Sequence, residues 1–178
     1  GCGETPYITL ITRLFGERMI VANATGCSSI YGGSAPSTPY TTNDEGKGVA
    51  WANSLFEDNA EFGMGMNVAM ETMRHRIEDI MRNNIDSVPN ALSALYNDWI
   101  NFKNDGVKTQ EITKNLLPIL EQNLSAPGVK EILELKKFLV KKSQWIIGGD
   151  GWAYDIGFGG LDHVLASGEN VNVLVLDT

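Results

Sequence analysis

The stretch Trp145-Ile146-Ile147-Gly148-Gly149-Asp150-Gly151-Trp152 decides the fold of this chain. An apolar run ends in glycines that flank one aspartate, and a helical pattern of apolar residues follows over residues 153–166. This order predicts a buried strand, a tight turn and a helix start. Glycines let the backbone approach a diphosphate closely, and the first amides of the helix favour its negative charge. The turn is therefore where we expect a ligand to bind.

A second buried strand is predicted shortly after this helix. Residues 170–176 form a nearly continuous apolar run, as in parallel sheets, and Asp177 and Thr178 follow it. A right-handed strand-helix-strand unit brings Thr178 to the sheet edge that carries Asp150. Open α/β sheets bind ligands at this edge, so we expect both residues to hold a divalent cation against a diphosphate. The plain alternative for Gly149-Asp150-Gly151 is a turn whose aspartate caps the helix.

Composition places the chain among ordinary globular proteins. It has 178 residues, the size of one domain, with 43% hydrophobic and 20% charged residues. The net charge of -8, with no extended basic stripe, argues against nucleic acid as a partner. No apolar run is long enough to cross a bilayer, so we expect no membrane segment. Two cysteines are too few for a disulfide scaffold, which favours a reducing compartment such as the cytoplasm.

The first part of the chain predicts a helix, a strand and a long loop. Thr5 is a candidate N-cap with a proline at the first helical position, and Gly16 ends the apolar helical pattern. Residues 19–22 then form a short apolar run, which predicts a buried parallel strand that delivers residues 23–29 to the ligand edge. Glycine, serine, proline and threonine dominate residues 31–48, which predicts a long loop.

A long helix is predicted next, from Ser54 or Glu57 to about Asn84. Its first half contains Gly63 and Gly65, which weaken helix propensity by about 1 kcal/mol each relative to alanine. We expect the two glycines to allow close packing against another backbone or against a cofactor.

Residues 85–142 differ in character from the rest of the chain. Amphipathic patterns without a strand-like run predict three helices, at residues 89–102, 109–123 and 128–142. We interpret this region as a helical insertion in an α/β core formed by residues 1–84 and 143–178. The predicted fold is one three-layer α/β/α domain with a mainly parallel sheet. The abrupt ends of the chain lead us to expect that it is part of a longer polypeptide.

Both cysteines and one glutamate are expected near the same edge. Cys2 precedes the first helix and Cys27 follows the first strand, so both converge on the edge that carries Asp150. Two ordinary reduced thiols remain the alternative to metal ligation, since a paired spacing such as C-x-x-C is missing. The plain interpretation of Glu4 is a first-turn carboxylate that complements the helix dipole.

Several segments together form a specific set of motifs. They are Cys2-Gly3-Glu4-Thr5-Pro6-Tyr7, residues 23–36, residues 51–59, Gly149-Asp150-Gly151-Trp152-Ala153-Tyr154-Asp155-Ile156-Gly157, Leu161-Asp162-His163 and residues 170–178. This set closely resembles the thiamine diphosphate domain of the pyruvate:ferredoxin (flavodoxin) oxidoreductases. The resemblance covers residues 1–84 and 143–178 and is weak between them. By the resemblance, residues 32–43 and 51–59 form a wall of the active site, whereas the neutral interpretation is a structural loop and helix entry.

The resemblance implies a set of cofactor ligands. Thiamine diphosphate would be bound by Glu4, Cys27, Gly149, Asp150, Gly151, Trp152 and Thr178. Mg²⁺ would be held by Asp150 and Thr178, and Cys2 and Cys27 would be two of the four thiolate ligands of a 4Fe-4S cluster. The other two cluster ligands lie outside this chain in the family.

The resemblance also implies the activity of the whole enzyme. Pyruvate and coenzyme A would be converted to acetyl-CoA and CO₂, with electrons passed through iron-sulfur clusters to ferredoxin or flavodoxin. The remaining domains of the same chain and a homodimer are expected, in the cytoplasm or in a hydrogenosome-like organelle, and the fragment alone is expected to be inactive. The alternatives are a related 2-oxoacid or pyruvate:NADP oxidoreductase with the same domain, and a non-enzymatic Rossmann-like binding module.

Overall fold

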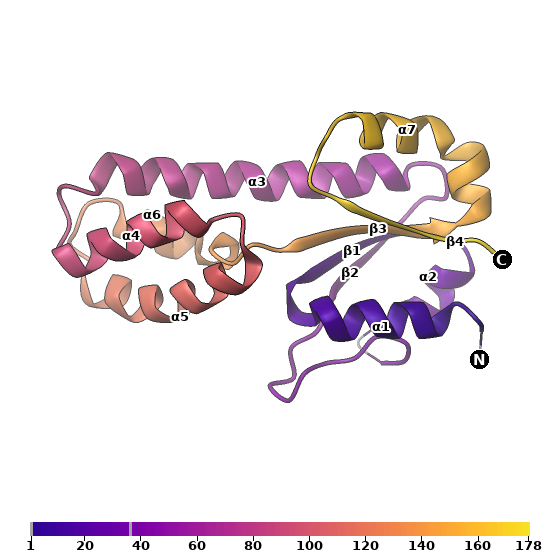
Figure 1. The fold of residues 1–178 in the computed structure, drawn as a ribbon, viewed down its shortest axis with the longest axis horizontal. Helices are drawn as coiled ribbons and strands as arrows, with labels where there is room; N and C mark the ends of the chain where they lie inside the picture. Colours follow the sequence, from indigo (N-terminus) through magenta and orange to yellow (C-terminus); the bar gives the residue numbers. More distant parts are fainter. Residues whose placement is uncertain (1, 36) are drawn as a thin grey trace. The chain divides into compact units, whose positions relative to one another are not determined.

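The computed structural model describes residues 2–35 and 37–178, and its centre is a four-stranded parallel sheet (Figure 1). The strands are β1 (Met19–Ala24), β2 (Ala50–Ser54), β3 (Ser143–Gly149) and β4 (Asn172–Leu176). Their order across the sheet is β2-β1-β3-β4, and every neighbouring pair is parallel. The predicted α/β class with a parallel sheet is confirmed.

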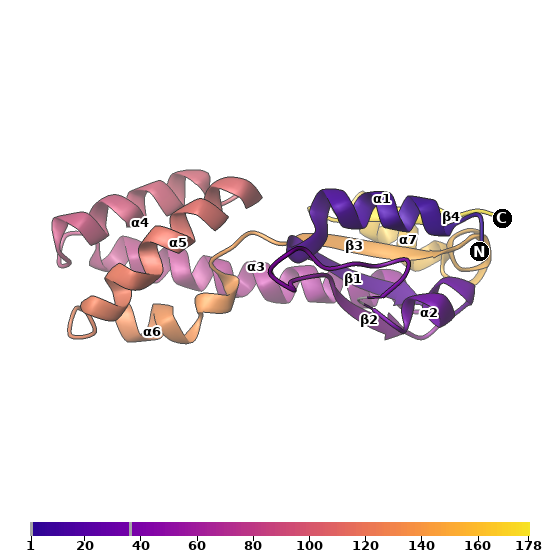
Figure 2. The same cartoon turned by 90° about the horizontal axis from the view of Figure 1, so that it is seen from below.

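Helices cover both faces of this sheet (Figures 1 and 2). They are α1 (Thr5–Phe15), the short 3₁₀ turn η1 (Gly16–Arg18), α2 (Cys27–Gly32), the start of α3 (Asn59–Asn84), the π-helical turn η3 (Trp152–Ile156) and α7 (Phe158–Ala166). Figure 1 shows α1 and α2 on one side of the strands, and α7 and the start of α3 on the other. The arrangement is the predicted three-layer α/β/α architecture.

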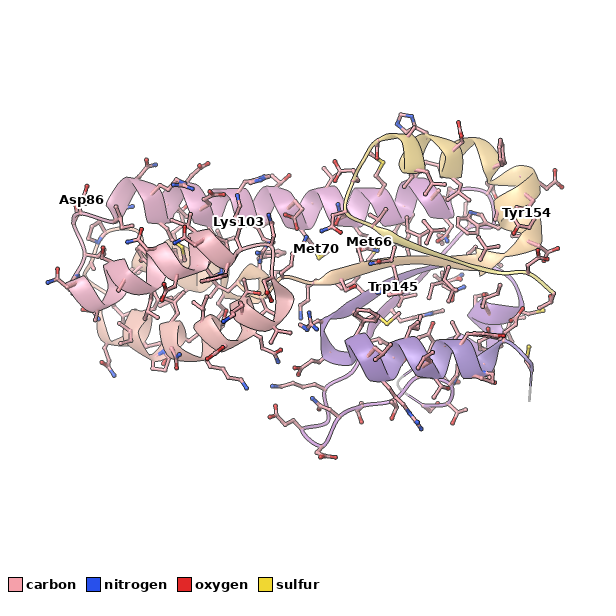
Figure 3. The ribbon with its side chains drawn as sticks, in the orientation of Figure 1. Met66, Met70, Asp86, Lys103, Trp145 and Tyr154 are labelled. Atoms are coloured by element: carbon pink, nitrogen blue, oxygen red, sulfur yellow. The ribbon has the colours of Figure 1, made fainter. Side chains whose placement is uncertain are left out.

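Alternate side chains of β3 divide the core between the two faces. Trp145 and Ile147 are buried with Ile8 of α1, whereas Ile146 is buried with Ala60 of α3 and with residues of α7. Figure 3 shows Trp145 on the α1 side, where its ring lies 5.2 Å from that of Phe15. Successive side chains of a strand point to opposite faces, so a strand covered on both sides must be apolar at every position. This explains the continuous apolar run in the sequence.

The ends of α1 follow from local chemistry, with a shift of one residue from the prediction. Glu4 occupies the N-cap position and Thr5 is the first helical residue, so Thr5 as the N-cap is wrong. The Thr5 hydroxyl instead donates a hydrogen bond to the carbonyl oxygen of Cys2 at 2.9 Å. Gly16 ends the helix, as predicted, with a φ of 22° and its N–H donated to the carbonyl of Thr12.

The largest correction to the predicted elements is β2. Residues 50–54 pair in register with residues 20–24 of β1, although the sequence analysis placed them within a loop and a helix entry. The helix α3 begins at Asn59, later than the predicted Ser54 or Glu57, and ends at Asn84 as predicted. The polar segment after β1 also contains α2, so the irregular connection is shorter than expected.

The chain divides into two compact units, residues 1–68 with 142–178, and residues 69–141. The second unit contains only helices in its described residues: the rest of α3, α4 (Asn90–Phe102), α5 (Gly106–Gln122), α6 (Val129–Glu134) and the 3₁₀ turn η2 (Lys136–Phe138). The predicted helical character of this region is confirmed, although its third helix ends earlier than expected. The fully buried side chains of its own core include Ile77, Met81, Leu92, Tyr96, Trp99, Leu116, Leu120, Ile132 and Leu139.

A buried arginine closes one end of this helical core. The guanidinium of Arg74 donates hydrogen bonds to the carbonyl oxygens of Phe138 at 2.6 Å, Leu139 at 3.0 Å and Lys103. It also lies 5.0 Å from the ring of Trp99, whose indole N–H donates to the carbonyl of Leu139 at 2.9 Å. Buried polar groups are costly unless they are paired. Arg74 therefore stabilises the ends of α4 and η2, where these carbonyl groups need hydrogen-bond donors.

No helix in the described part of the chain is both long enough and apolar enough to cross a membrane.

Candidate functional site

The candidate site lies where β3 and β4 end. Gly149 of β3 pairs with Leu176 of β4, so the residues that follow, Asp150 and Asp177, leave the sheet from neighbouring strand ends. Thr178 follows Asp177 at the same edge. The helix after β3 begins at Asp150, directly after the last strand residue, Gly149. The predicted tight turn between the strand and the helix is therefore not a separate element. The register thus brings the two predicted magnesium ligands to one edge of the sheet.

A network of buried polar side chains fixes this edge. The Ser54 hydroxyl donates to the side-chain oxygen of Asn59 at 2.8 Å, and the Asn59 amide donates to the carbonyl of Ile147 at 3.0 Å. The Asn23 amide donates to the hydroxyl of Ser28 at 2.9 Å, and Asn23, Ser54 and Asn59 are all buried. The Ser54 hydroxyl also lies 3.3 Å from the carbonyl oxygen of Asn23, to which it can donate. These bonds therefore connect the ends of β1, β2 and β3.

Trp152 anchors the start of the helix after β3. Its side chain is fully buried, and a side chain at Gly148 or Gly157 would collide with the Trp152 ring. These two glycines are therefore required by close packing. Since the indole lies inside the core, we expect Trp152 to meet a cofactor through its backbone. Gly149 has no such constraint, because an added Cβ would meet its nearest neighbour, the Leu176 carbonyl oxygen, only at 3.7 Å.

A pocket of about 350 Å³ opens beside the end of β4. It is lined by Gly3, Glu4, Tyr7, Leu174, Val175, Leu176, Asp177 and Thr178. The pocket therefore joins the segment that starts α1 to the end of β4. Its volume lies at the lower end of the range for small-molecule sites.

Glu4 is a buried carboxylate in the wall of this pocket. Only 7% of the residue is exposed, and its Oε2 accepts a hydrogen bond from the hydroxyl of Tyr31 at 2.9 Å. The pKa of Tyr31 is raised, first by burial, then by the hydrogen bond and the charge of Glu4, and further by the charge of Cys2. The phenol therefore stays protonated at neutral pH and keeps donating to Glu4.

The two cysteines are exposed and unbonded to each other. Cys27 is the first residue of α2 and Cys2 lies just before α1. The structure shows no group of three or more histidine, cysteine and acidic side chains that could hold a metal within the described residues.

The pKa of Tyr154 responds to the carboxylates at the ends of β3 and β4. This pKa is raised by desolvation, then by the charge of Asp177 and a hydrogen bond with it, and then by the charge of Asp150. Figure 3 shows Tyr154 beside the edge of the sheet at which β4 ends. Because one phenol interacts with both carboxylates, Asp150 and Asp177 share one negatively charged region at this edge.

Asp150 and Thr178 are the predicted ligands at this edge whose side-chain oxygens suit a hard divalent cation. Asp150 and Thr178 offer one carboxylate and one hydroxyl oxygen, and Mg²⁺ commonly takes one or two protein ligands while phosphates and water supply the rest. The helix that follows β3 begins at Asp150, so its N-terminus lies at the same edge.

Three features of the edge were missed by the sequence analysis. Tyr31 and Tyr154 belong to the motif segments, but no individual role was predicted for either. Asp177 was named only as the residue before Thr178. The partner of Tyr31 is 27 residues away in sequence, so only the fold reveals that contact. A signal for Asp177 was present, since it follows the same strand as Thr178.

The fold and the site together define an α/β protein with a parallel sheet, two carboxylates at one sheet edge and a neighbouring pocket. No family model matches the chain. The whole chain is, however, 55% identical over 180 residues to the pyruvate-flavodoxin oxidoreductase of Klebsiella pneumoniae and 55% identical over 185 residues to the pyruvate:ferredoxin oxidoreductase of Moorella thermoacetica. The chain is thus homologous to one segment of these enzymes, and the predicted resemblance is confirmed.

The chain spans about 15% of the length of the curated relatives it matches. A third relative carries a different name: the mitochondrial pyruvate dehydrogenase [NADP(+)] of Euglena gracilis is 55% identical over 181 residues, which are 10% of its length. The resemblance also extends over the whole chain, whereas the sequence analysis found it weak in the helical region.

Proposed function

We propose that this chain is the thiamine diphosphate and Mg²⁺ binding domain of a pyruvate oxidoreductase. The observation that carries the proposal is the pairing of Gly149 with Leu176, which brings Asp150 and Thr178 to one sheet edge. The names of the relatives, all at least half identical where cited, support pyruvate as the substrate. The pocket that Thr178 and Glu4 line supports the proposal, although Gly149, Asp150 and Gly151 do not line it.

In this proposal Asp150 and Thr178 hold the cation, and the helix that begins at Asp150 directs its first amides at the phosphates. Gly149 and Gly151 keep the backbone free of side chains where the diphosphate approaches. Glu4 and the backbone of Trp152 complete the binding wall. When bound, the cofactor would supply a carbon nucleophile and an electron sink for decarboxylation of the 2-oxoacid.

Cys2 and Cys27 provide two thiolate ligands for a 4Fe-4S cluster, and residues outside this chain provide the other two. Exposed thiols on adjoining segments support this assignment over buried structural cysteines. A cluster beside the cofactor would remove electrons one at a time. Coenzyme A as a substrate, ferredoxin or flavodoxin as the acceptor, a homodimer and a cytoplasmic location complete the proposal.

An NADP-linked enzyme is the second candidate. It is favoured by the Euglena relative, whose name includes NADP(+) and whose identity to this chain equals that of the flavodoxin-linked relative. The domain would act in the same way in both enzymes. Assay of pyruvate-dependent reduction of ferredoxin, flavodoxin and NADP⁺ by the full-length protein would distinguish them.

The cofactor assignment is tested by calorimetric titration of the full-length protein with thiamine diphosphate, with and without Mg²⁺. We expect saturable binding that requires Mg²⁺ and is lost or weakened at least tenfold in Asp150→Ala, since that change removes the charged ligand of the cation. Unchanged affinity in Asp150→Ala would overturn the magnesium assignment. No binding to the parent protein would overturn the proposed function itself.

A further inference from the structure

The hydrogen bond between Tyr31 and Glu4 connects two segments that are far apart in sequence. Tyr31 lies on α2, four residues after Cys27, and Glu4 lies two residues after Cys2. The bond is 2.9 Å long and one of its partners, Glu4, is almost fully buried. It is thus a direct side-chain link between the segment that carries one candidate thiolate and the segment that carries the other.

The two segments are each rigid in themselves. The Thr5 hydroxyl and backbone N–H both donate to the Cys2 carbonyl, which fixes the backbone before α1. On the other side, Ser29 bonds both backbone groups of Gly26, which fixes the start of α2 at Cys27. The part-buried bond between Tyr31 and Glu4 therefore connects two segments whose backbones are each held by local hydrogen bonds.

The bond also sets the direction of the Glu4 carboxylate. Because Oε2 accepts from Tyr31, the second oxygen is available to a ligand in the pocket that Glu4 lines. A carboxylate that is mostly buried needs such a donor, since an unpaired buried charge is unfavourable. Tyr31 itself does not line the pocket, so its effect on a ligand must pass through Glu4.

We propose that Tyr31 is a positioning residue which orients Glu4 toward the cofactor and holds the Cys2 and Cys27 segments at the spacing that a shared cluster requires. This inference rests on the proposed function and adds a residue that touches neither the cofactor nor the cluster. Its role is to pre-organise the groups that do.

The test is a double-mutant cycle in the full-length protein. Tyr31→Phe, Glu4→Gln and the double variant are titrated with thiamine diphosphate in Mg²⁺, and their iron content and visible absorbance are measured after anaerobic purification. Tyr31→Phe is expected to weaken cofactor binding roughly tenfold, the size of one hydrogen bond to a charged group. In the Glu4→Gln background the same change is expected to have a much smaller effect, because the charged acceptor is gone.

A merely structural role predicts a different pattern. It would give the same loss in both backgrounds, and that result would overturn the inference, as would unchanged affinity and cluster content in Tyr31→Phe. The matched control is Tyr40→Phe, which removes a hydroxyl from the same buried core but not from a residue bonded to Glu4. Tyr40→Phe should leave both readouts within about twofold of the parent protein.

A second comparison applies if Tyr31→Phe does not fold. Glu4→Gln retains an oxygen that can accept from Tyr31, whereas Glu4→Ala does not, so Glu4→Ala should lose iron faster on exposure to a chelator. Equal rates of iron loss in these two variants would overturn the inference. If the parent protein binds thiamine diphosphate, any of these contrary results refutes only the role of Tyr31 and leaves the proposed function standing. If the parent protein does not bind thiamine diphosphate, the proposed function itself is refuted.

Discussion

Gly149 and Leu176 are paired residues of adjacent parallel strands, and this pairing determines what meets at the carboxyl edge of the sheet. Both strands end at this pair, so Asp150 and Asp177 are the first residues after neighbouring strand ends. Thr178 follows Asp177. The charges of Asp177 and Asp150 both raise the pKa of Tyr154, as expected for two carboxylates at one edge. An edge with this charge is suited to a cation that bridges protein and phosphate oxygens.

The two glycines at the start of α3 are expected to respond in opposite ways to alanine. At Gly63 an added Cβ would lie 2.5 Å from Cγ1 of Ile146 in the sheet core, so Gly63→Ala should lower the free energy of unfolding by about 1–3 kcal/mol. At Gly65 no atom lies within 4 Å, so Gly65→Ala should raise it by about 0.5–1 kcal/mol. Chemical denaturation of the protein, followed by tryptophan fluorescence, measures both.

The pair is its own control, because both positions lie in the same helix and receive the same side chain. A stabilising Gly63→Ala would contradict the packing of α3 on β3. The prediction was close packing of both glycines against another backbone or a cofactor. Gly63 does pack closely, but against the side chains of Ile146 and Ala22. Gly65 has no neighbouring backbone within 4 Å, and the cofactor alternative stays a prediction there.

Replacement of either cysteine should reduce the bound cluster. Cys27→Ala removes one proposed thiolate ligand, so the iron content and visible absorbance of the anaerobically purified full-length protein should fall to less than about half. Cys2→Ala should act in the same way. The control is Ile30→Ala on α2, since Ile30 is 81% exposed and carries no ligand atom. An unaltered spectrum in Cys27→Ala would exclude cluster ligation by this residue.

The stability of the helical unit should depend on pH through Glu78. Burial acts to raise the pKa of Glu78, but hydrogen bonds from Lys103 and Arg82 outweigh it and lower the pKa below its ordinary value. Figure 3 marks Lys103 in this unit, and Arg82 donates to the Glu78 carboxylate at 2.8 Å. A group with a lowered folded-state pKa stabilises the fold above its unfolded pKa, and that contribution is lost as the pH falls through the folded-state pKa.

Glu78→Gln should therefore reduce the free energy of local unfolding by about 1–2 kcal/mol at neutral pH. The difference from the parent should narrow once the pH falls below about 4, where carboxylates become protonated. Amide hydrogen exchange of α3 and α4, expressed as protection factors, measures this. Glu121→Gln changes an exposed carboxylate on α5 and is the control. A difference that stays constant down to low pH would refute the electrostatic explanation.

Most of the sheet was predictable because β1, β3 and β4 are apolar runs followed by polar or glycine residues. The strand β2 was missed for a physical reason: its sequence, Ala50-Trp51-Ala52-Asn53-Ser54, has no strong strand pattern. It is an edge strand whose conformation is set by pairing with β1, and such tertiary pairing commonly overrides local propensity.

The candidate site was predictable only in part. Asp150 and Thr178 could be placed at one edge because strand-helix-strand units have a fixed hand. The burial of Trp152 and the bond from Tyr31 to Glu4 could not be predicted, because each depends on side chains that are distant in sequence or on glycines that admit a large ring. Pairwise contacts of this kind have no periodic signal in sequence.

The central claim, that Asp150 and Thr178 together hold a cation on a diphosphate, is tested most directly by a crystal structure of the full-length protein with thiamine diphosphate and Mn²⁺ in place of Mg²⁺. Anomalous diffraction then locates the ion. The account predicts one Mn²⁺ peak at about 2.2 Å from a carboxylate oxygen of Asp150 and from the hydroxyl of Thr178, with phosphate oxygens completing its shell. A bound cofactor whose Mn²⁺ contacts neither residue would contradict it.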